Sequence, residues 1–229
     1  NLFAAVKFYR AAAAAGIKPI FGAQLNIQHD NQAIYPAYVY CQNETGFANL
    51  KKLISWGYTQ GQINGLPCIK QALLYEYHQG LLYVSAGLED YIGQNILHDK
   101  LILAKNYLQT ISRIFADRFY LKIARTKKPQ QTLYNYHAAN LAAELDVPIA
   151  ATNEVYFLNE ADFYAHEARV CINRGDVLID PKRRKDFNSE QYFKSIDQMQ
   201  ALFSDVPQAC ANTVEIAKRC NVHLPLGKV

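Results

Sequence analysis

Short apolar segments alternate with longer amphipathic ones along most of this chain, and this alternation is the feature that most restricts its fold. Runs rich in β-branched and aromatic residues predict strands at 19–27, 37–41, 81–85, 119–123 and 148–152. Apolar residues at helical spacing predict helices over 2–15, 99–115, 130–145 and 207–220, and further helices that begin near residues 45, 160 and 195. Such alternation indicates an α/β fold with a parallel sheet covered by helices. It fits a closed barrel and an open sheet equally well.

Two of the expected helices carry recognisable end signals. Gly16 follows the first helix at the place where a left-handed residue commonly ends one. Ser195 and Gln198 match a capping box at the start of another. The apolar face of the first helix consists of Phe3, Val6, Tyr9 and Ala13. In either form of the fold, functional groups are expected in the loops that follow the carboxyl ends of the strands.

The composition is that of a soluble, folded protein. Of the 229 residues, 50% are hydrophobic and 19% are charged, which excludes intrinsic disorder, and polar residues interrupt every stretch that could span a membrane. The five cysteines lack the spacing of zinc or redox motifs, so we expect reduced thiols and a cytoplasmic location. The sequence begins with Asn1 and ends in an apolar passage at 224–227, and we interpret it as a fragment of a longer protein.

A search for chemical motifs gives a scaffold without a convincing site. The chain has no nucleotide-binding glycine loop, no Gly-x-Ser-x-Gly elbow and no His-Glu-x-x-His helix. No two of the six histidines lie closer than twenty residues, so capping and packing roles are expected, with His166 packed beneath the sheet. Glu154, just after the strand at 148–152, is the best placed acid or ligand.

One run of positive charge remains open to two interpretations. Lys182, Arg183, Arg184 and Lys185 follow one another between two aspartates. A solvated loop and a phosphate-facing loop both fit this pattern. The net charge of +4 is too small to decide between them.

The order of several motifs carries a resemblance that no single motif does. Residues 16–22 read GIKPIFG, 43–46 read NETG, 150–155 read AATNEV, 212–222 read NTVEIAKRCNV and 224–228 read LPLGK. In this order they resemble the PHP (polymerase and histidinol phosphatase) domains of bacterial DNA polymerase III alpha subunits. The resemblance implies an α/β fold, a distorted (βα)7 barrel that lacks its first two strands here. It also implies that residues 1–195 belong to the barrel and residues 196–229 to a helical segment and linker toward a palm domain.

The resemblance also implies where a metal cluster would be held. In active relatives the barrel mouth binds divalent ions that activate water against a phosphoester. The ligand positions of the family fall on Gln24, Pro36, Gly87, Glu154 and Tyr156. Only Glu154 offers an ionisable oxygen ligand suited to a divalent cation. We therefore expect a vestigial site with no catalytic residue, metal or cofactor in this chain, although relatives bind zinc or manganese and the parent polymerase uses magnesium.

Three functions compete. The first is a non-catalytic PHP domain within a DNA-directed DNA polymerase (a nucleotidyltransferase of chromosomal replication), which supports the rest of the alpha subunit and docks an epsilon-type proofreading exonuclease. The second is an active metal-dependent phosphoesterase or 3′–5′ exonuclease, and the third is a free-standing PHP-like protein. The passage at 212–228 favours the first over the third, because it resembles the entry into a palm domain.

The first function also sets the expected partners. They are the rest of the alpha subunit, the exonuclease subunit, and the replisome and DNA through the parent protein, without a membrane. Strand edges left open by the absent strands predict self-association as well.

Overall fold

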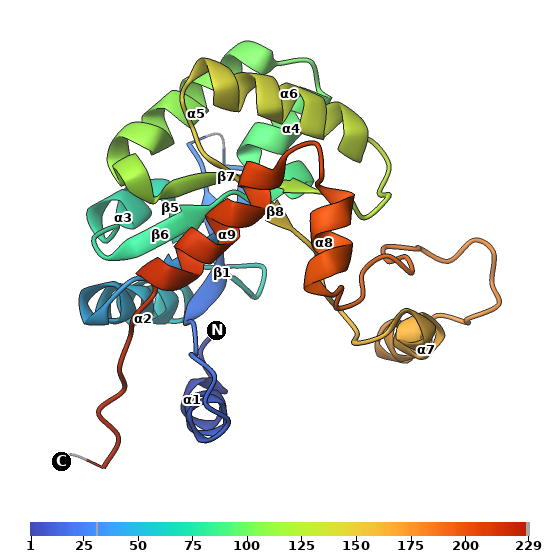
Figure 1. The fold of residues 1–229 in the computed structure, drawn as a ribbon, viewed down its shortest axis with the longest axis horizontal. Coiled ribbons are helices and arrows are strands. Elements are labelled where there is room, and N and C mark those ends of the chain that lie inside the picture. Colours follow the sequence, from blue (N-terminus) through green and yellow to red (C-terminus); the bar gives the residue numbers. More distant parts are fainter. Residues whose placement is uncertain (31, 228–229) are drawn as a thin grey trace.

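The computed structural model describes residues 1–30 and 32–227, which form a mixed α/β structure around a six-stranded sheet (Figure 1). The strands of this sheet are β1 (Gly22–Gln28), β2 (Ile34–Cys41), β5 (Ile69–Lys70), β6 (Leu81–Val84), β7 (Phe119–Ala124) and β8 (Ile149–Thr152). A separate hairpin consists of β3 (Gln62–Ile63) and β4 (Leu66–Pro67). The α-helices are α1 (Ala5–Ala14), α2 (Glu44–Thr59), α3 (Gln71–Glu76), α4 (Tyr91–Leu97), α5 (Leu101–Phe115), α6 (Gln131–Glu144), α7 (Phe163–Arg174), α8 (Ile196–Leu202) and α9 (Pro207–Arg219). The 3-10 helices are η1 (Gly87–Glu89), η2 (Ala116–Arg118) and η3 (Glu160–Asp162).

The sheet runs in the order β5-β1-β2-β6-β7-β8, and β2 is its only antiparallel member among the described strands. The pairs β1–β5, β6–β7 and β7–β8 are parallel. The expected α/β class is confirmed, but the expectation of a fully parallel sheet is wrong at β2. The connection from β1 to β2 is too short for a parallel crossover and makes a hairpin instead. As described, the sheet is open, with β5 and β8 at its edges, so a closed barrel is not confirmed.

The two faces of the sheet carry apolar clusters of different size. Side chains alternate between the faces along a strand, and in β7 Phe119, Leu121 and Ile123 join the main core beneath α2 to α6. Figure 1 shows α4, α5 and α6 together on one side of the sheet. The opposite face has a small cluster, to which β7 contributes Tyr120 and α9 contributes Ile216. Position 122 falls on this less covered face.

Local signals explain several helix boundaries. Gly16 has a φ of +67° after α1, as expected for a residue that ends a helix. The capping box of α8 is confirmed: the amide N–H of Gln198 donates to Ser195 Oγ (3.2 Å), and the amide N–H of Ser195 donates to Gln198 Oε1 (2.8 Å). At the start of α2, the amide N–H of Gly46 donates to Asn43 Oδ1 at 3.0 Å. These contacts satisfy N–H groups that a helix leaves unpaired in its first turn.

Helix α1 forms as predicted, yet most of its apolar face is exposed. Tyr9 stacks on Phe21 with a distance of 6.0 Å between ring centroids, whereas Phe3 and Val6 face solvent. Figure 1 shows α1 below the sheet rather than against it. Alanines fill half of the helix, and Ala5 and Tyr9 are its residues that pack against the main core.

The C-terminal helices pack on the sheet instead of extending away from it. Phe203, just after α8, is fully buried in the main core. The ammonium group of Lys18 donates to Ala217 O (2.7 Å) at the end of α9, and the amide N–H of Asn221 donates to Gln42 O (2.8 Å). The boundary predicted after residue 195 stays a prediction.

Residues 159–187, here called the α7 arm, project from the sheet (Figure 1). Two backbone contacts close the base of the arm: a β-bridge between Phe157 and Tyr192, and a hydrogen bond from Tyr156 N to Gln191 O (2.9 Å). Within the described ranges, every helix is too short or too polar to cross a lipid bilayer.

Candidate functional site

A cavity of about 290 Å³ lies at the carboxyl ends of β7 and β8, on the face of the sheet opposite the main core. Its wall combines tyrosine hydroxyls with one buried ion pair. The lining residues are Tyr38, Tyr40, Val84, Lys122, Thr152, Asn153, Glu154, Val155 and Tyr156. This is the edge of the sheet at which an α/β fold is expected to carry its functional groups.

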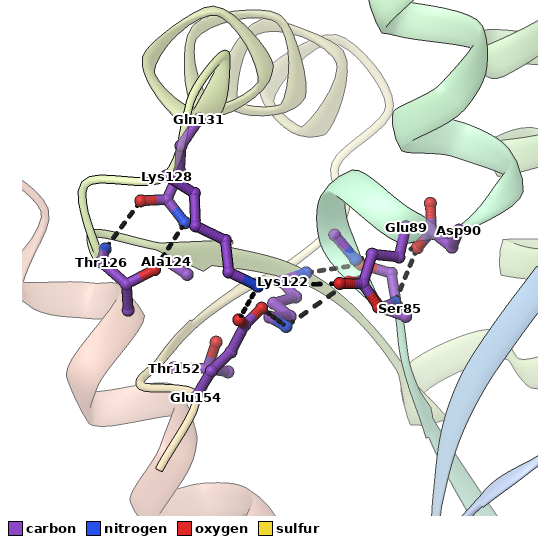
Figure 2. A network of polar contacts seen from close by, with 12 residues as sticks. Ser85, Glu89, Asp90, Lys122, Ala124, Thr126, Lys128, Gln131, Thr152 and Glu154 are labelled. Carbon is purple, nitrogen blue, oxygen red and sulfur yellow. Dashed lines mark hydrogen bonds and ion pairs between the residues drawn. The ribbon is translucent and has the colours of Figure 1, made fainter. Parts of the chain in front are cut away.

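Glu154 is held by two lysines from neighbouring segments (Figure 2). Lys122 Nζ lies 2.9 Å from Glu154 Oε1, Lys128 Nζ forms an ion pair with Glu154 Oε2, and Gln191 Nε2 donates to the same Oε2 at 3.3 Å. Burial opposes ionisation of this carboxyl group, but the two ammonium groups outweigh it and keep the pKa of Glu154 below its usual value. The carboxylate therefore stays charged and bonded on both oxygens.

Lys122 is fixed by hydrogen bonds of its own backbone. Its amide N–H donates to Ser85 Oγ at 2.8 Å, and its carbonyl oxygen accepts from the Tyr134 hydroxyl at 2.8 Å. The side chain is only 4% exposed. A lysine this deeply buried normally requires a paired anion, which here is Glu154.

The loops around the pair are held by polar contacts that Figure 2 shows together. The Asp90 carboxylate caps α4 and accepts from the N–H groups of Ala86 (2.7 Å), Gly87 (3.1 Å) and Gly93 (2.8 Å). Burial raises the pKa of Asp90 to about 6, although the three donors act against this shift. These three hydrogen bonds thus fix the turn at Ala86 and Gly87, which faces Lys122.

Gln131 fixes the second loop, which carries Lys128. Its side chain accepts from the amide N–H of Thr126 (2.7 Å) and donates to the hydroxyl of the same residue (3.2 Å). Lys128 Nζ also lies 3.6 Å from Glu89 Oε1. Lys128 therefore bridges the loops that follow β6 and β8.

The five ligand positions of the resemblance are only partly brought together. Glu154 and Tyr156 line the cavity, and Gly87 lies beside it, since a Cβ built on Gly87 would be 3.4 Å from Lys122 Cδ. Gln24 is exposed on β1 opposite Tyr38, and Pro36 lies opposite Asn26 in the same hairpin. Among residues 1–30 and 32–227, no three His, Cys, Asp or Glu side chains are grouped so that they could hold a metal ion.

The tyrosines do not replace the missing ligands. Burial, followed by the Glu154 charge, raises the pKa of both Tyr38 and Tyr156, so their hydroxyls stay protonated at neutral pH. A neutral phenol is a weak ligand for a hard divalent cation. With one carboxylate already shared by two ammonium groups, the residues present do not fit a metal cluster.

The histidines lie outside the cavity. His98 ends α4, His78 accepts from Arg118 Nη2 (2.9 Å), and neither lines the site. The prediction for His166 is half right, because the ring is buried but not beneath the sheet. It lies in the α7 arm, 4.6 Å from the ring centroid of Phe187.

The basic run does not act as one surface. The Arg183 side chain is 9% exposed and pairs with the buried Glu167, whereas Arg184 is 79% exposed and lies 2.6 Å from Asp186. The guanidinium group of Arg183 is thus engaged inside the arm, and its role in a phosphate-facing loop stays a prediction. Lys182 and Lys185 are exposed, and their role in phosphate contact stays a prediction.

Sequence reasoning missed the two lysines that neutralise Glu154, of which Lys122 also lines the cavity. One signal was available: Lys122 is the only charged residue in the strand Phe119–Ala124, whose other members are apolar. A charge inside a fully buried strand is costly and indicates a fixed partner. Lys128 gave no comparable signal, because it lies in a polar loop.

Comparisons with known proteins agree with the resemblance carried by the order of the motifs. The sequence model of the PHP domain family matches residues 1–126. DNA polymerase III subunit alpha of Pseudomonas fluorescens is 42% identical over 230 residues, the same subunit of Escherichia coli K12 is 41% identical, and that of Vibrio cholerae is 39% identical. Each alignment covers 100% of this chain and 20% of the relative, so the chain spans about a fifth of the length of the proteins it matches.

Proposed function

Because this chain belongs to the PHP domain family, we propose that it is the PHP domain of a DNA polymerase III alpha subunit and that the domain itself is not catalytic. The observation that carries the first part is identity of about 40% along the whole chain to proteins of that name. The parent protein would then be a cytoplasmic DNA-directed DNA polymerase of chromosomal replication. The domain would support its other parts.

The Lys122–Glu154–Lys128 cluster supports the absence of catalysis. Metal-assisted hydrolysis requires several negative or imidazole ligands around the ions that activate water. Here the single carboxylate of the cavity is neutralised by two lysines, and positions 24, 36, 87 and 156 offer no charged ligand. No free general base faces the cavity from the residues that line it.

A nuclease assay tests this proposal directly. The chain is incubated with a 5′-labelled single-stranded oligonucleotide and with Mg²⁺, Mn²⁺ or Zn²⁺, and we expect no shortening beyond that in buffer alone. A Glu154→Gln variant serves as the control for contamination. Nuclease activity that is present in the unmodified chain and lost in Glu154→Gln would favour the alternative of an active phosphoesterase or exonuclease, because a contaminating enzyme would be unaffected.

We also propose that the domain belongs to a (βα)7 barrel that other parts of the polymerase complete. The open edges at β5 and β8 support this, because unpaired strand edges are usually covered in native proteins. The proposal predicts a difference between this chain and a longer version that includes the preceding polymerase residues. In the longer version, the amide groups of β8 should exchange hydrogen more slowly. Equal exchange of β8 in both versions would contradict it.

The partner we propose is an epsilon-type proofreading exonuclease subunit, which would supply the activity that the domain lacks. An apolar groove of about 610 Å³ lies between α8 and α9 and includes Ile196, Met199 and Val214. Phe193 and Ile196 are exposed at its rim. Exposed aromatic and aliphatic anchors of this kind dominate the binding energy of protein interfaces.

Calorimetry against the exonuclease subunit tests the docking. We expect Phe193→Ser to weaken binding by about tenfold or more, as for a typical anchor residue. Tyr164→Ser is the matched control, since Tyr164 is equally exposed but lies on the α7 arm away from the groove residues. Undiminished binding of Phe193→Ser would exclude the groove as the docking surface. Failure of the extended protein to bind at tens of micromolar would reject docking altogether.

A further inference from the structure

The Lys122 ammonium group contacts two oxygen acceptors and the face of one aromatic ring. Nζ lies 2.9 Å from Glu154 Oε1 and 3.4 Å from Ala86 O, and it lies over the Tyr38 ring at 5.3 Å from the centroid. The face of an aromatic ring attracts a cation at this distance. The side chain is 4% exposed, so these three groups replace its water shell.

The surroundings of this ammonium group coincide with the ligand positions described above. Glu154 is one of those positions, and Gly87, which lies beside the lysine stem, is another. A Cβ on Gly87 would lie 3.4 Å from Lys122 Cδ and 3.5 Å from Cε, and Gly87 has a φ of +76°, which disfavours any side chain there. A ligand side chain at position 87 would be strained by this φ, would lie in van der Waals contact with the lysine stem and would face its ammonium group.

The geometry points to Lys122 as the resident cation of this cavity: its ammonium group binds the Glu154 carboxylate where a divalent ion would otherwise bind, and it keeps such an ion out. This inference rests on the proposed function, in which the domain carries no metal. The inference goes further than that function, because it assigns the exclusion of divalent ions from the cavity to one residue, Lys122. The missing ligands alone would leave a weak site, whereas Lys122 closes it.

Removal of the lysine should open a weak cation site. Lys122→Ala would leave Glu154 Oε1 and Ala86 O facing the space of the ammonium group. Asn153 Oδ1, which is buried without a hydrogen-bond partner in the described part of the chain, belongs to the same cavity. Oxygen donors of this kind suit Mn²⁺, and so few of them predict a dissociation constant on the order of 1 mM.

The experiment compares melting temperatures of the purified chain and of Lys122→Ala, with and without MnCl₂, at constant ionic strength. We expect Lys122→Ala to melt about 6–15 °C lower, because it leaves a buried carboxylate without its main partner. Addition of 10 mM MnCl₂ should raise its melting temperature by about 3–6 °C, whereas the unmodified chain should shift by less than about 1 °C. The free Mn²⁺ signal in electron paramagnetic resonance reports binding independently of stability.

Three matched variants separate this cation site from a general effect of charge. Lys122→Ala/Glu154→Gln lacks the carboxylate and should not respond to Mn²⁺. Lys128→Ala removes the other lysine but keeps Lys122, and Tyr156→His adds an imidazole but keeps Lys122, so neither should respond. Mn²⁺ binding by the unmodified chain, or an equal response in any of these three variants, would overturn the inference.

Two further outcomes are also decisive. If Lys122→Ala is unfolded in metal-free buffer, MnCl₂ must restore its native circular dichroism, and failure to do so counts against the inference. If the folded variant binds no Mn²⁺ while the unmodified chain shows no nuclease activity, the inference fails and the proposed function stands. Glu154-dependent nuclease activity in the unmodified chain would instead reject the proposed function.

Discussion

His29 lies buried after β1 and stacks on Tyr91 with ring centroids 4.6 Å apart and planes 5° apart. Burial lowers the pKa of His29 to about 4, although Asp30 acts in the opposite direction. The folded state therefore binds fewer protons at this ring than the unfolded state, whose histidine titrates near 6.5. Stability is fully present above about pH 6.5 and is lost as the pH falls toward 4.

We expect the free energy of unfolding to fall by about 1–2 kcal/mol between pH 7.5 and pH 5 through His29 alone. His29→Phe keeps an aromatic ring in the stack but cannot take up a proton, so its loss over the same interval should be smaller. Urea unfolding at the two pH values measures this difference. Some loss should remain in the variant, because burial also lowers the pKa of His78 and His166. Identical losses in both proteins would contradict the prediction.

Gly46 provides a second test at the scale of one residue. A Cβ on Gly46, in the first turn of α2, would overlap the carbonyl oxygen of Gly80. We expect Gly46→Ala to cost about 3 kcal/mol, since overpacking against backbone cannot relax by side-chain movement. Gly57→Ala lies in the same helix, and its Cβ would be 3.4 Å from Cys68 O, so it should be neutral or stabilise by up to about 1 kcal/mol. Denaturant unfolding of both variants gives the comparison, and equal losses would refute it.

The position of Glu154 was predictable, while its chemical state was not. Its place just after a buried strand marked it as the best placed acid, and the structure puts it in the cavity wall. The partners that neutralise it come from β7 and from the loop after β7, 32 and 26 residues earlier in the chain. Spacing along a sequence does not reveal pairs that form only through strand order.

At the scale of elements, two adjacent arginines of the α7 arm differ in their burial and in their partners. Arg183 pairs with the buried Glu167 and also donates to Leu178 O at 3.0 Å, whereas Arg184 is exposed. We expect Arg183→Ala to loosen the arm, because it leaves the Glu167 carboxylate buried without its partner. Arg184→Ala should leave the arm unchanged.

Limited trypsin digestion measures this effect, because cleavage follows the population of the opened segment. We expect the arm of Arg183→Ala to be cut about tenfold faster than that of the unmodified chain, and that of Arg184→Ala to be cut at the unmodified rate or more slowly. Cleavage sites outside residues 159–187 serve as the internal reference. Equal protection of the arm in both variants would show that the Arg183–Glu167 pair does not hold it.

Elements with strong local signals were predicted well, and those that depend on their neighbours were missed. The helices at α5, α6 and α9 and the strands β6 to β8 lie within a few residues of the expected ranges. The two-residue strand β5 and the short helices α3 and α4 were not predicted, since such segments are too short to show periodicity. The reversed direction of β2 follows from the short turn before it, a signal that the alternation of strands and helices concealed.

At the scale of the whole molecule, the open sheet predicts association between chains. Among the described strands β8 pairs with β7 alone, and an exposed strand edge can pair with another chain. Asn212 Nδ2 occupies one acceptor there by donating to Ile149 O at 2.8 Å, and β8 is only four residues long, so the association should be weak. Light scattering should show a mass that rises with concentration in the high micromolar range.

A proline in the edge strand provides the matched variant for this prediction. Residues 150 and 152 direct their N–H groups at β7 in the parallel register, in which Leu121 N donates to Pro148 O, so the N–H group of Ala151 faces the open edge. Ala151→Pro removes this outward N–H group without taking a bond from the sheet. The rise in mass should shrink in Ala151→Pro if its circular dichroism is unchanged. A strict monomer at every concentration in the unmodified chain would contradict the prediction.

The contact between Gly87 and the Lys122 stem has a consequence for how this sequence can change over generations. A donor side chain introduced at position 87 alone would be strained by the positive φ and would face an ammonium group, and a neutral residue introduced at position 122 alone would leave Glu154 without one of its two counter-charges. Each first step back toward a metal site is therefore harmful on its own, and only both together would be useful. The two substitutions are therefore epistatic, and single substitutions that are each favourable do not lead from this sequence back to a metal site.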